Sequence, residues 1–314
     1  MKRKLTIAIL LLLSFAAVLF LIPITENKSV EVNASYLVVK EQFSVNQNLA
    51  KWIHPFSDIS KDELQLDAET GKGIRGKDIT VTTEFLNPLV ILVKFRDKTT
   101  SGEFQFQMNP DELNTQRTGV RLSYKTNFFQ KLRKPLFENY AEESLQNLKT
   151  YMEDAKQFYG YEMQVVKVTD TAFLVTQAIV KKANIADKAN ELYNKLISFA
   201  EKTNAGYYGI KIFHKERTGT DEYELSVGIG ITKMFPVNAG PGIEFKQMPF
   251  GKNLLMCTYV GLYGEIEKAY EAMEKFKQEH SLSSMAIPFE RLPENTVIVN
   301  DDEMVRLQIF YPIF

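Results

Sequence analysis

The sequence predicts an α+β protein with antiparallel sheets, in which one N-terminal transmembrane helix precedes two folded domains. Three observations lead to this prediction. An uncharged run stands near the N-terminus, a series of short alternating segments ends in a long amphipathic helix, and an order of strand, helix, strand, strand then occurs twice. The expected boundaries are residues 1–27 for a membrane anchor, 28–158 for the first domain and 159–314 for the second.

The uncharged run covers residues 5–25 and follows three basic residues at positions 2–4. At ~1.5 Å per residue, about 20 helical residues cross a ~30 Å hydrocarbon core, so we expect a single-pass helix in the cytoplasmic membrane. The basic cluster favours a cytoplasmic N-terminus, which leaves both domains on the extracytoplasmic side. The alternative is a cleaved secretory signal, with Val32 and Ala34 in the small-residue positions of the cleavage site.

The composition narrows the classes of partner. Lys and Arg number 38 against 39 Asp and Glu, so the chain lacks the basic excess that drives phosphate-backbone contacts, and we expect no nucleic-acid partner. Hydrophobic residues make up 45% of the chain, enough to fill two cores and to line a cavity. The single cysteine, Cys257, lies in an apolar run. No cysteine stands directly after the N-terminal run, which excludes a bacterial lipid anchor there.

Short alternating runs between residues 29 and 128 predict an antiparallel meander with hairpin connections. From Pro135 onward, apolar residues at helical spacing predict a long helix that packs on this sheet. We interpret the glycines of residues 71–76 as a hairpin connection and not as a phosphate-binding loop, because they open no helix. The predicted strands are residues 63–68, 79–85, 89–95, 102–108 and 120–126.

The second domain shows an internal duplication. Its two predicted helices carry matching apolar stripes, and each follows an extended segment and precedes two strands. A seam between two like halves is a common place for a ligand cleft. The first copy comprises an extended segment at 163–180, a helix at 185–201 and strands at 207–214 and 223–231. The second comprises an extended segment at 243–260, a helix at 264–279 and strands at 286–292 and 304–313.

Three local motifs of the second domain carry a resemblance to a known family. The string YVGLYGEI at residues 259–266, with Ala269 and Tyr270 further on, is similar to the glycine-tyrosine opening of the second helix in GyrI-like (gyrase-inhibitor-like) effector-binding domains. The segment PFERL at 288–292 and the segment IFYPI at 309–313 resemble that family's penultimate segment and its closing strand. The resemblance covers about residues 160 to 314.

The first domain resembles the START-like (SRPBCC, polyketide-cyclase-like) fold. A short strand at residues 29–33, a helical stretch at 37–43, Trp52, the meander and the final helix carry this resemblance. It implies a helix-grip cavity for lipids or other apolar molecules. The sequence departs from that family after Trp52, where few of the usual tryptophans and glycines occur. We expect Trp52 to be a core or lid residue and not a ligand contact.

The GyrI-like resemblance implies binding of bulky, often amphipathic or cationic compounds between the two repeats, commonly beside an acidic side chain. Some members hydrolyse their ligands. The family often has a glutamate four residues before the closing-strand proline, where this chain has Gln308, and a tyrosine where it has Leu292. A neutral amide cannot act as a general base or neutralise a buried cation, so we interpret Gln308 as weakening both roles. Glu290 is then the carboxylate to test.

Other catalytic signatures do not occur in the sequence. His54, His214 and His280 have no second histidine or cysteine at metal spacing, and GxSxG and HExxH motifs do not occur. We therefore expect neither a cofactor nor a metal site.

The aromatic residues of the duplicated sheet admit two interpretations. They pack beneath the helices, or, where alternation turns them to the other face, they line a cleft. We predict ligand contacts from Tyr208, Phe289, Glu290, Gln308 and Phe310, whereas Tyr263 and Tyr270 are assigned to core packing.

The sequence thus favours a membrane-tethered protein that binds an apolar or amphipathic small molecule between the repeats, without catalysis. Two alternatives remain open. One is a hydrolase with Glu290 as the general base, and the other is a protein-facing structural or signalling role.

Overall fold

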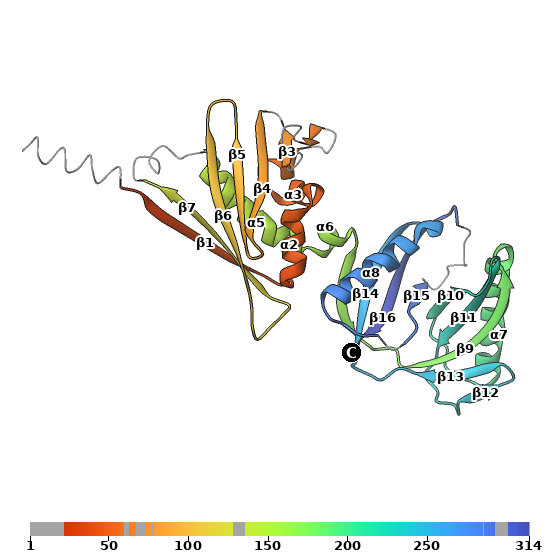
Figure 1. The fold of residues 1–314 in the computed structure, drawn as a ribbon. Helices are drawn as coiled ribbons and strands as arrows, with labels where there is room; N and C mark the ends of the chain where they lie inside the picture. Colours follow the sequence, from red (N-terminus) through yellow and green to blue (C-terminus); the bar gives the residue numbers. More distant parts are fainter. Residues whose placement is uncertain are drawn as a thin grey trace, which may run out of the picture. The chain divides into compact units, whose positions relative to one another are not determined.

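The computed structural model of the chain describes residues 22–59, 63–66, 73–76, 78–127, 136–284, 286–292 and 301–313 (Figure 1). The chain divides into two compact units, Met1–Asp154 and Ala155–Phe314. Each combines helices with an antiparallel sheet, as the sequence predicts. Most of the hydrophobic run at 5–25 lies outside the described residues, among which no helix is long and apolar enough to cross a membrane.

The first unit contains a seven-stranded antiparallel sheet in the order β1-β7-β6-β5-β4-β3-β2. Strand β1 begins at Ile24 and pairs with β7, so residues 24–27, which the sequence assigns to the anchor, belong to this sheet. The strands are β1 (Ile24–Val32), β2 (Gln65–Leu66), β3 (Gly73–Gly76), β4 (Ile79–Asn87), β5 (Val90–Arg96), β6 (Ser101–Pro110) and β7 (Thr118–Thr126).

Strand β3 lies in the stretch that the sequence analysis interprets as a connection. Its first residue, Gly73, pairs with Thr82 of β4. A Cβ atom at Gly73 would lie 2.5 Å from the carbonyl oxygen of Val81, so this strand approach requires glycine. Glycine is depleted in strands, which is why propensity alone predicts a loop here.

Helix α5 (Leu136–Glu153) packs on β1, β6 and β7, and Figure 1 shows it running across one face of the sheet. Two shorter helices, α2 (Tyr36–Ser44) and α3 (Asn46–Trp52), and a 3-10 turn, η1 (Phe56–Asp58), complete the described part of this unit. Trp52 is fully buried, with its ring centroid 4.9 Å from that of Phe43 and 6.4 Å from that of Phe106. Trp52 is therefore a core residue.

The second unit contains a nine-stranded antiparallel sheet in the order β12-β13-β9-β11-β10-β15-β16-β14-β8. Helix α7 (Ile185–Lys202) packs on β9 and β11, and helix α8 (Glu267–Glu279) packs on β14. The short helix α6 (Ala155–Tyr159) leads into β8, and 3-10 turns η3 (Lys182–Asn184) and η4 (Tyr263–Glu265) precede the two long helices. The strands are β8 (Glu162–Lys167), β9 (Ala172–Lys181), β10 (Lys211–Arg217), β11 (Glu222–Gly230), β12 (Asn238–Gly240), β13 (Ile243–Gln247), β14 (Asn253–Leu262), β15 (Phe289–Leu292) and β16 (Met304–Ile313).

Each predicted extended segment of the duplication consists of two strands that lie far apart in the sheet. Strand β8 precedes β9 in the chain but pairs with β14 of the second repeat. Strand β13 precedes β14 but pairs with β9 of the first repeat. The two repeats thus exchange their first strands. They meet in the middle of the sheet, where β10 pairs with β15.

The two faces of this sheet differ. Both helices pack on one face, over a continuous core that includes Phe213, Leu255 and Ile309. Residues next to these in the chain point to the opposite face, because strand side chains alternate. There, Leu254, Met256 and Phe310 form a smaller apolar cluster with Val168. We call these the helix face and the outer face.

Candidate functional site

The seam between the repeats places a carboxylate on the helix face. In β15, Glu290 pairs with Phe213 of β10 on one side and with Ile309 of β16 on the other. Its neighbours in the sheet are both core residues of the helix face, and Glu290 itself is 1% exposed. An ionised carboxylate in such a position requires hydrogen-bond donors or a counter-charge.

Two tyrosines supply the donors. The Tyr263 hydroxyl, from η4, donates to Oε2 of Glu290 at 3.0 Å, and the Tyr270 hydroxyl, from α8, donates to Oε1 at 3.1 Å. These residues belong to the glycine-tyrosine opening of the second helix. The beginning of the second long helix, with the 3-10 turn before it, therefore directs both hydroxyls toward β15. Among the described residues, no cationic side chain forms an ion pair with Glu290.

Burial raises the pKa of Glu290 to about 7. The charge of Lys215 and the two tyrosine hydrogen bonds oppose this shift, but they do not overcome the loss of solvation. Burial, followed by the charge of Glu290, raises the pKa of both Tyr263 and Tyr270 well above the ordinary value, so both remain protonated donors. Burial therefore favours the protonated form of Glu290 relative to an ordinary glutamate.

Glu290 lines a cavity of about 620 Å³ on the helix face, a volume typical of small-molecule sites. The glutamates outnumber the lysines in its lining by five to two. His214 adds little positive charge, because burial lowers its pKa, and its Nδ1 atom has no hydrogen-bond partner among the described residues. The lining residues are His214, Lys215, Glu216, Glu267, Tyr270, Glu271, Glu274, Lys275, Gln278, Ile287, Pro288, Glu290 and Tyr311.

The structure does not bring the five sequence-predicted site residues together. Phe289, Gln308 and Phe310 line a separate cavity of about 290 Å³ on the outer face. Tyr208 is 41% exposed, and its hydroxyl lies 3.4 Å from Asp170, which lines that same cavity. Glu290 alone faces the helices.

The interpretation of Gln308 changes with this arrangement. It points to the outer face, opposite Glu290, because residues 308 and 309 alternate along β16 and Ile309 belongs to the helix-face core. The neutral amide at position 308 therefore does not weaken the acidic character of the Glu290 cavity.

Sequence reasoning assigned Tyr263 and Tyr270 to core packing and so missed their polar role. Both rings are indeed packed among core residues, but their hydroxyls meet Glu290. The sequence does contain an indication of this role. A buried tyrosine hydroxyl needs a hydrogen-bond partner, and the predicted strand at 286–292 carries the carboxylate of Glu290.

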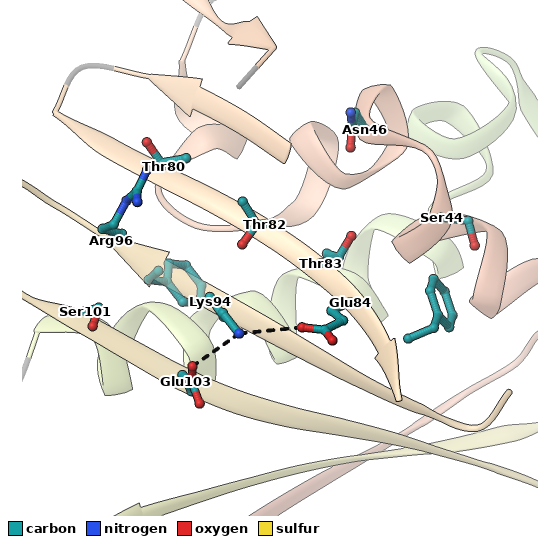
Figure 2. Close-up of a pocket in the computed structure, with 12 residues that line it drawn as sticks. Ser44, Asn46, Thr80, Thr82, Thr83, Glu84, Lys94, Arg96, Ser101 and Glu103 are labelled. Carbon is teal, nitrogen blue, oxygen red and sulfur yellow. Dashed lines mark ion pairs between the residues drawn. The ribbon is translucent and has the colours of Figure 1, made fainter. Parts of the chain in front are cut away.

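A larger cavity, of about 880 Å³, lies in the first unit beside β4, β5 and β6 (Figure 2). Figure 2 shows Lys94 between Glu84 and Glu103, with its Nζ atom 3.5 and 3.4 Å from their carboxylate oxygens. Both glutamates are well exposed and Lys94 is partly exposed, so these ion pairs are screened by solvent. This cavity has no counterpart to the buried carboxylate of the second unit, and we place the candidate site at Glu290.

Comparison with known families concerns the second unit. The family model described as GyrI-like small molecule binding domain matches residues 161–313. This part of the chain is a GyrI-like domain. The Glu290 cavity and the outer-face cavity both lie within the GyrI-like domain.

A search of curated proteins gives no match. Solved structures similar to the chain include the C-terminal domain of EcmrR, at 13% identity and a TM-score of 0.36, covering 49% of this chain and 98% of that one. A hydrolase from Listeria innocua is similar at 13% identity and a TM-score of 0.35, covering 52% and 98%. A START superfamily protein from Mycobacterium smegmatis is similar at 14% identity and a TM-score of 0.27, covering 40% and 97%.

Proposed function

We propose that the GyrI-like domain binds an amphipathic organic cation in the helix-face cavity, with its positive charge at Glu290. The observation that carries this proposal is a buried carboxylate that two tyrosines hold in place and that forms no ion pair within the described part of the chain. Such a group is costly to ionise when the cavity is empty. A bound cation would remove that cost, so the site favours positively charged ligands.

The walls of the cavity suit the apolar part of such a ligand. Tyr270 and Tyr311 lie with their ring centroids 6.1 Å apart, and Ile287 and Pro288 add aliphatic surface. Aromatic faces attract cations, and Lys277 already lies over the Tyr311 ring at 4.0 Å. The exposed glutamates of α8 add negative potential at the entrance and raise the local concentration of cations.

The test uses two probes of the same shape and opposite charge. Tetraphenylphosphonium is a lipophilic cation, and tetraphenylborate is the matching anion. We expect isothermal titration calorimetry of the protein to show binding of the cation and not of the anion. Glu290→Gln should weaken cation binding at least about tenfold, since it removes a desolvated charge. Glu271→Gln, the same change at an exposed residue of the cavity lining, should have less than about a threefold effect.

Two results would contradict the proposal. One is equal binding of both probes, and the other is cation binding that Glu290→Gln leaves intact. In either case the cavity recognises shape or apolar surface and not charge.

A second function has one specific observation in its favour. A carboxylate whose pKa is about 7 is matched to general-base catalysis at neutral pH, and neighbouring tyrosine hydroxyls can donate to a developing oxyanion. If the domain is a hydrolase, p-nitrophenyl ester turnover should rise with pH through about 7 and be lost in Glu290→Gln. Turnover at the same rate in both proteins would exclude Glu290 as the base.

We also propose that the chain is tethered to the cytoplasmic membrane, with both units on its extracytoplasmic side. The support is the uncharged run behind the basic residues at positions 2–4. Since residues 22 and 23 are not helical and β1 begins at Ile24, residues 5–21 remain for the membrane, which at ~1.5 Å per helical residue span roughly 26 Å. The full chain should pellet with membranes after a carbonate wash, and a chain without residues 1–21 should not. Recovery of the full chain in the soluble fraction would exclude tethering.

A further inference from the structure

The outer face of the nine-stranded sheet carries a second cavity that the Glu290 site does not use. From its geometry, we propose that it binds a small, flat, uncharged aromatic molecule. The observation that supports this proposal is a stacked pair of phenylalanines on neighbouring strands in the middle of the sheet. Phe289 of β15 and Phe310 of β16 are register partners, and their rings stack with centroids 5.3 Å apart at an interplanar angle of 18°.

The stacked pair forms part of an apolar surface on a face that neither α7 nor α8 covers. Phe310, Met256, Leu254 and Val168 form a cluster separate from the helix-face core, and Phe289 is only partly buried against it. Methionines make soft, adaptable contacts with aromatic rings, and aromatic ligands prefer offset stacking on exposed ring faces.

The size of this cavity limits its occupant. Its volume is about 290 Å³, at the lower end of the range for small-molecule sites, so it admits a molecule of two or three rings and excludes a helix or a folded partner. Both repeats contribute to it. Phe173, Ile210 and Ile212 come from the first repeat, whereas Met256 and Phe310 come from the second.

The charges around the cavity predict an uncharged ligand. Arg291 and Asp170 form an ion pair at 3.0 Å, so each already has a charged partner. Lys167, the other charged residue of the lining, is exposed, and its ammonium donates to Oδ1 of Asn253 at 2.7 Å, so solvent screens its charge. The Tyr208 hydroxyl also lies beside Asp170, at 3.4 Å. The amides of Gln164 and Gln308 offer both a donor and an acceptor to a polar group on the ligand. This differs from the Glu290 cavity on the other face, where the buried carboxylate forms no ion pair with any residue that the structure describes.

The test again uses matched probes, here N-phenyl-1-naphthylamine, which is uncharged, and 1-anilinonaphthalene-8-sulfonate, its anionic relative. Fluorescence titration of the full chain should show saturable binding of the uncharged probe and much weaker binding of the sulfonate. Phe289→Ala should weaken binding of the uncharged probe about tenfold or more. Phe289→Leu, which keeps apolar surface but removes the ring, should have a smaller effect. Phe250→Ala changes a phenylalanine that is 78% exposed and lies outside the cavity, so it should leave binding unchanged.

Three outcomes would overturn the proposal. Unchanged binding in Phe289→Ala would place the probe elsewhere. Displacement of the uncharged probe by tetraphenylphosphonium would mean that one cavity takes both ligands. A dimer in sedimentation velocity that Phe289→Ala dissociates would make this face a self-association surface. Because the Phe289 series does not involve the cation, its outcome is independent of cation binding at Glu290.

Discussion

Glu290 and Lys277 are the two charged side chains that are buried among the described residues, and the structure compensates them differently. The Lys277 ammonium has Glu274 at 2.8 Å and the Tyr311 ring at 4.0 Å, so its charge is neutralised within the protein. Glu290 has two hydroxyl donors and no ion-pair partner among those residues. Under the proposed function, this difference marks Lys277 as a structural charge and Glu290 as the binding group.

The pKa of Glu290 predicts how stability depends on pH. It is about 7 in the folded protein against 4.5 for an ordinary glutamate, so the folded state holds this proton more tightly than the unfolded state. The favourable contribution is complete below pH 4.5 and is lost as pH rises through 7, an effect of about 3 kcal/mol. Urea unfolding at pH 5 and pH 8 should show this loss in the native protein, and Glu290→Gln should show a smaller one. Equal pH dependence in the two proteins would contradict it.

Removing one of the two tyrosine donors should raise the pKa of Glu290 further. Tyr270→Phe deletes a hydrogen bond to the ionised form, which is worth about 1.5–3 kcal/mol, and should raise the pKa of Glu290 by roughly one unit or more. The pH at which tetraphenylphosphonium binding is half lost should rise with it. Tyr124→Phe is the matched control, since it removes a tyrosine–glutamate hydrogen bond to Glu142 in the first unit. A shift of the same size in both variants would show that the effect is not local.

At the residue scale, the sequence pattern points to Glu290 as a candidate but does not predict its surroundings. Glu290 was selected because it stood in a family motif on a predicted strand of the duplicated sheet. Its burial and its tyrosine partners depend on which face of β15 the helices cover, and that follows from the register of β15 with β10 and β16. Alternation along a strand specifies two faces but not which one is inside.

At the scale of elements, the predicted bounds differ in accuracy from one element to the next. Helix α7 begins at Ile185, where the apolar stripe begins, and ends one residue later than predicted. Strand β10 begins at Lys211, four residues later than predicted, because Gly206 and Gly209 have positive φ angles and hold residues 207–210 in a connection. The hydrophobic pattern alone does not reveal a backbone constraint of this kind.

The connection after α7 gives a prediction about backbone strain. Gly206 has a φ of +71°, and a Cβ atom there would lie 2.0 Å from Oγ1 of Thr232. Gly206→Ala should lower the free energy of unfolding by more than about 3 kcal/mol, through strain and the steric clash together. Gly160 has a φ of +87°, and a Cβ atom there would meet no other atom within 4 Å, so Gly160→Ala should cost only about 1–2 kcal/mol. Chemical denaturation measures both, and equal losses would exclude the clash with Thr232.

At the scale of the whole molecule, the chain consists of two units with separate cores. The core of the second unit is formed within the residues from Ala155 onward, and its sheet uses no strand of the first unit. We expect residues 155–314 to fold on their own and to bind tetraphenylphosphonium within about threefold of the full chain. Circular dichroism melting and calorimetry check this. Loss of cooperative unfolding in the fragment would show that the first unit contributes to its stability.

The α+β class and the antiparallel sheets were predictable because they depend on local periodicity. Pairings between distant strands were not. The sequence contains the same two extended segments whether β8 pairs with its own repeat or with the other one, since both arrangements bury the same alternating residues. The outer-face cavity was unpredictable for the same reason, because its lining comes from strands of both repeats.

The exchange of first strands between the repeats makes the GyrI-like domain comparable to a swapped dimer fused into one chain. Lys167 of β8 contacts Asn253, 86 positions away, and each repeat completes its partner's sheet edge. Neither repeat can form its full sheet before the other has been synthesised, so folding requires loops to close over long distances. We therefore expect a destabilising change in β8 to affect β14 and α8 first, because β8 pairs with β14 of the other repeat and α8 packs on β14. Evolution of one half is thus constrained by the fit of its strand into the other.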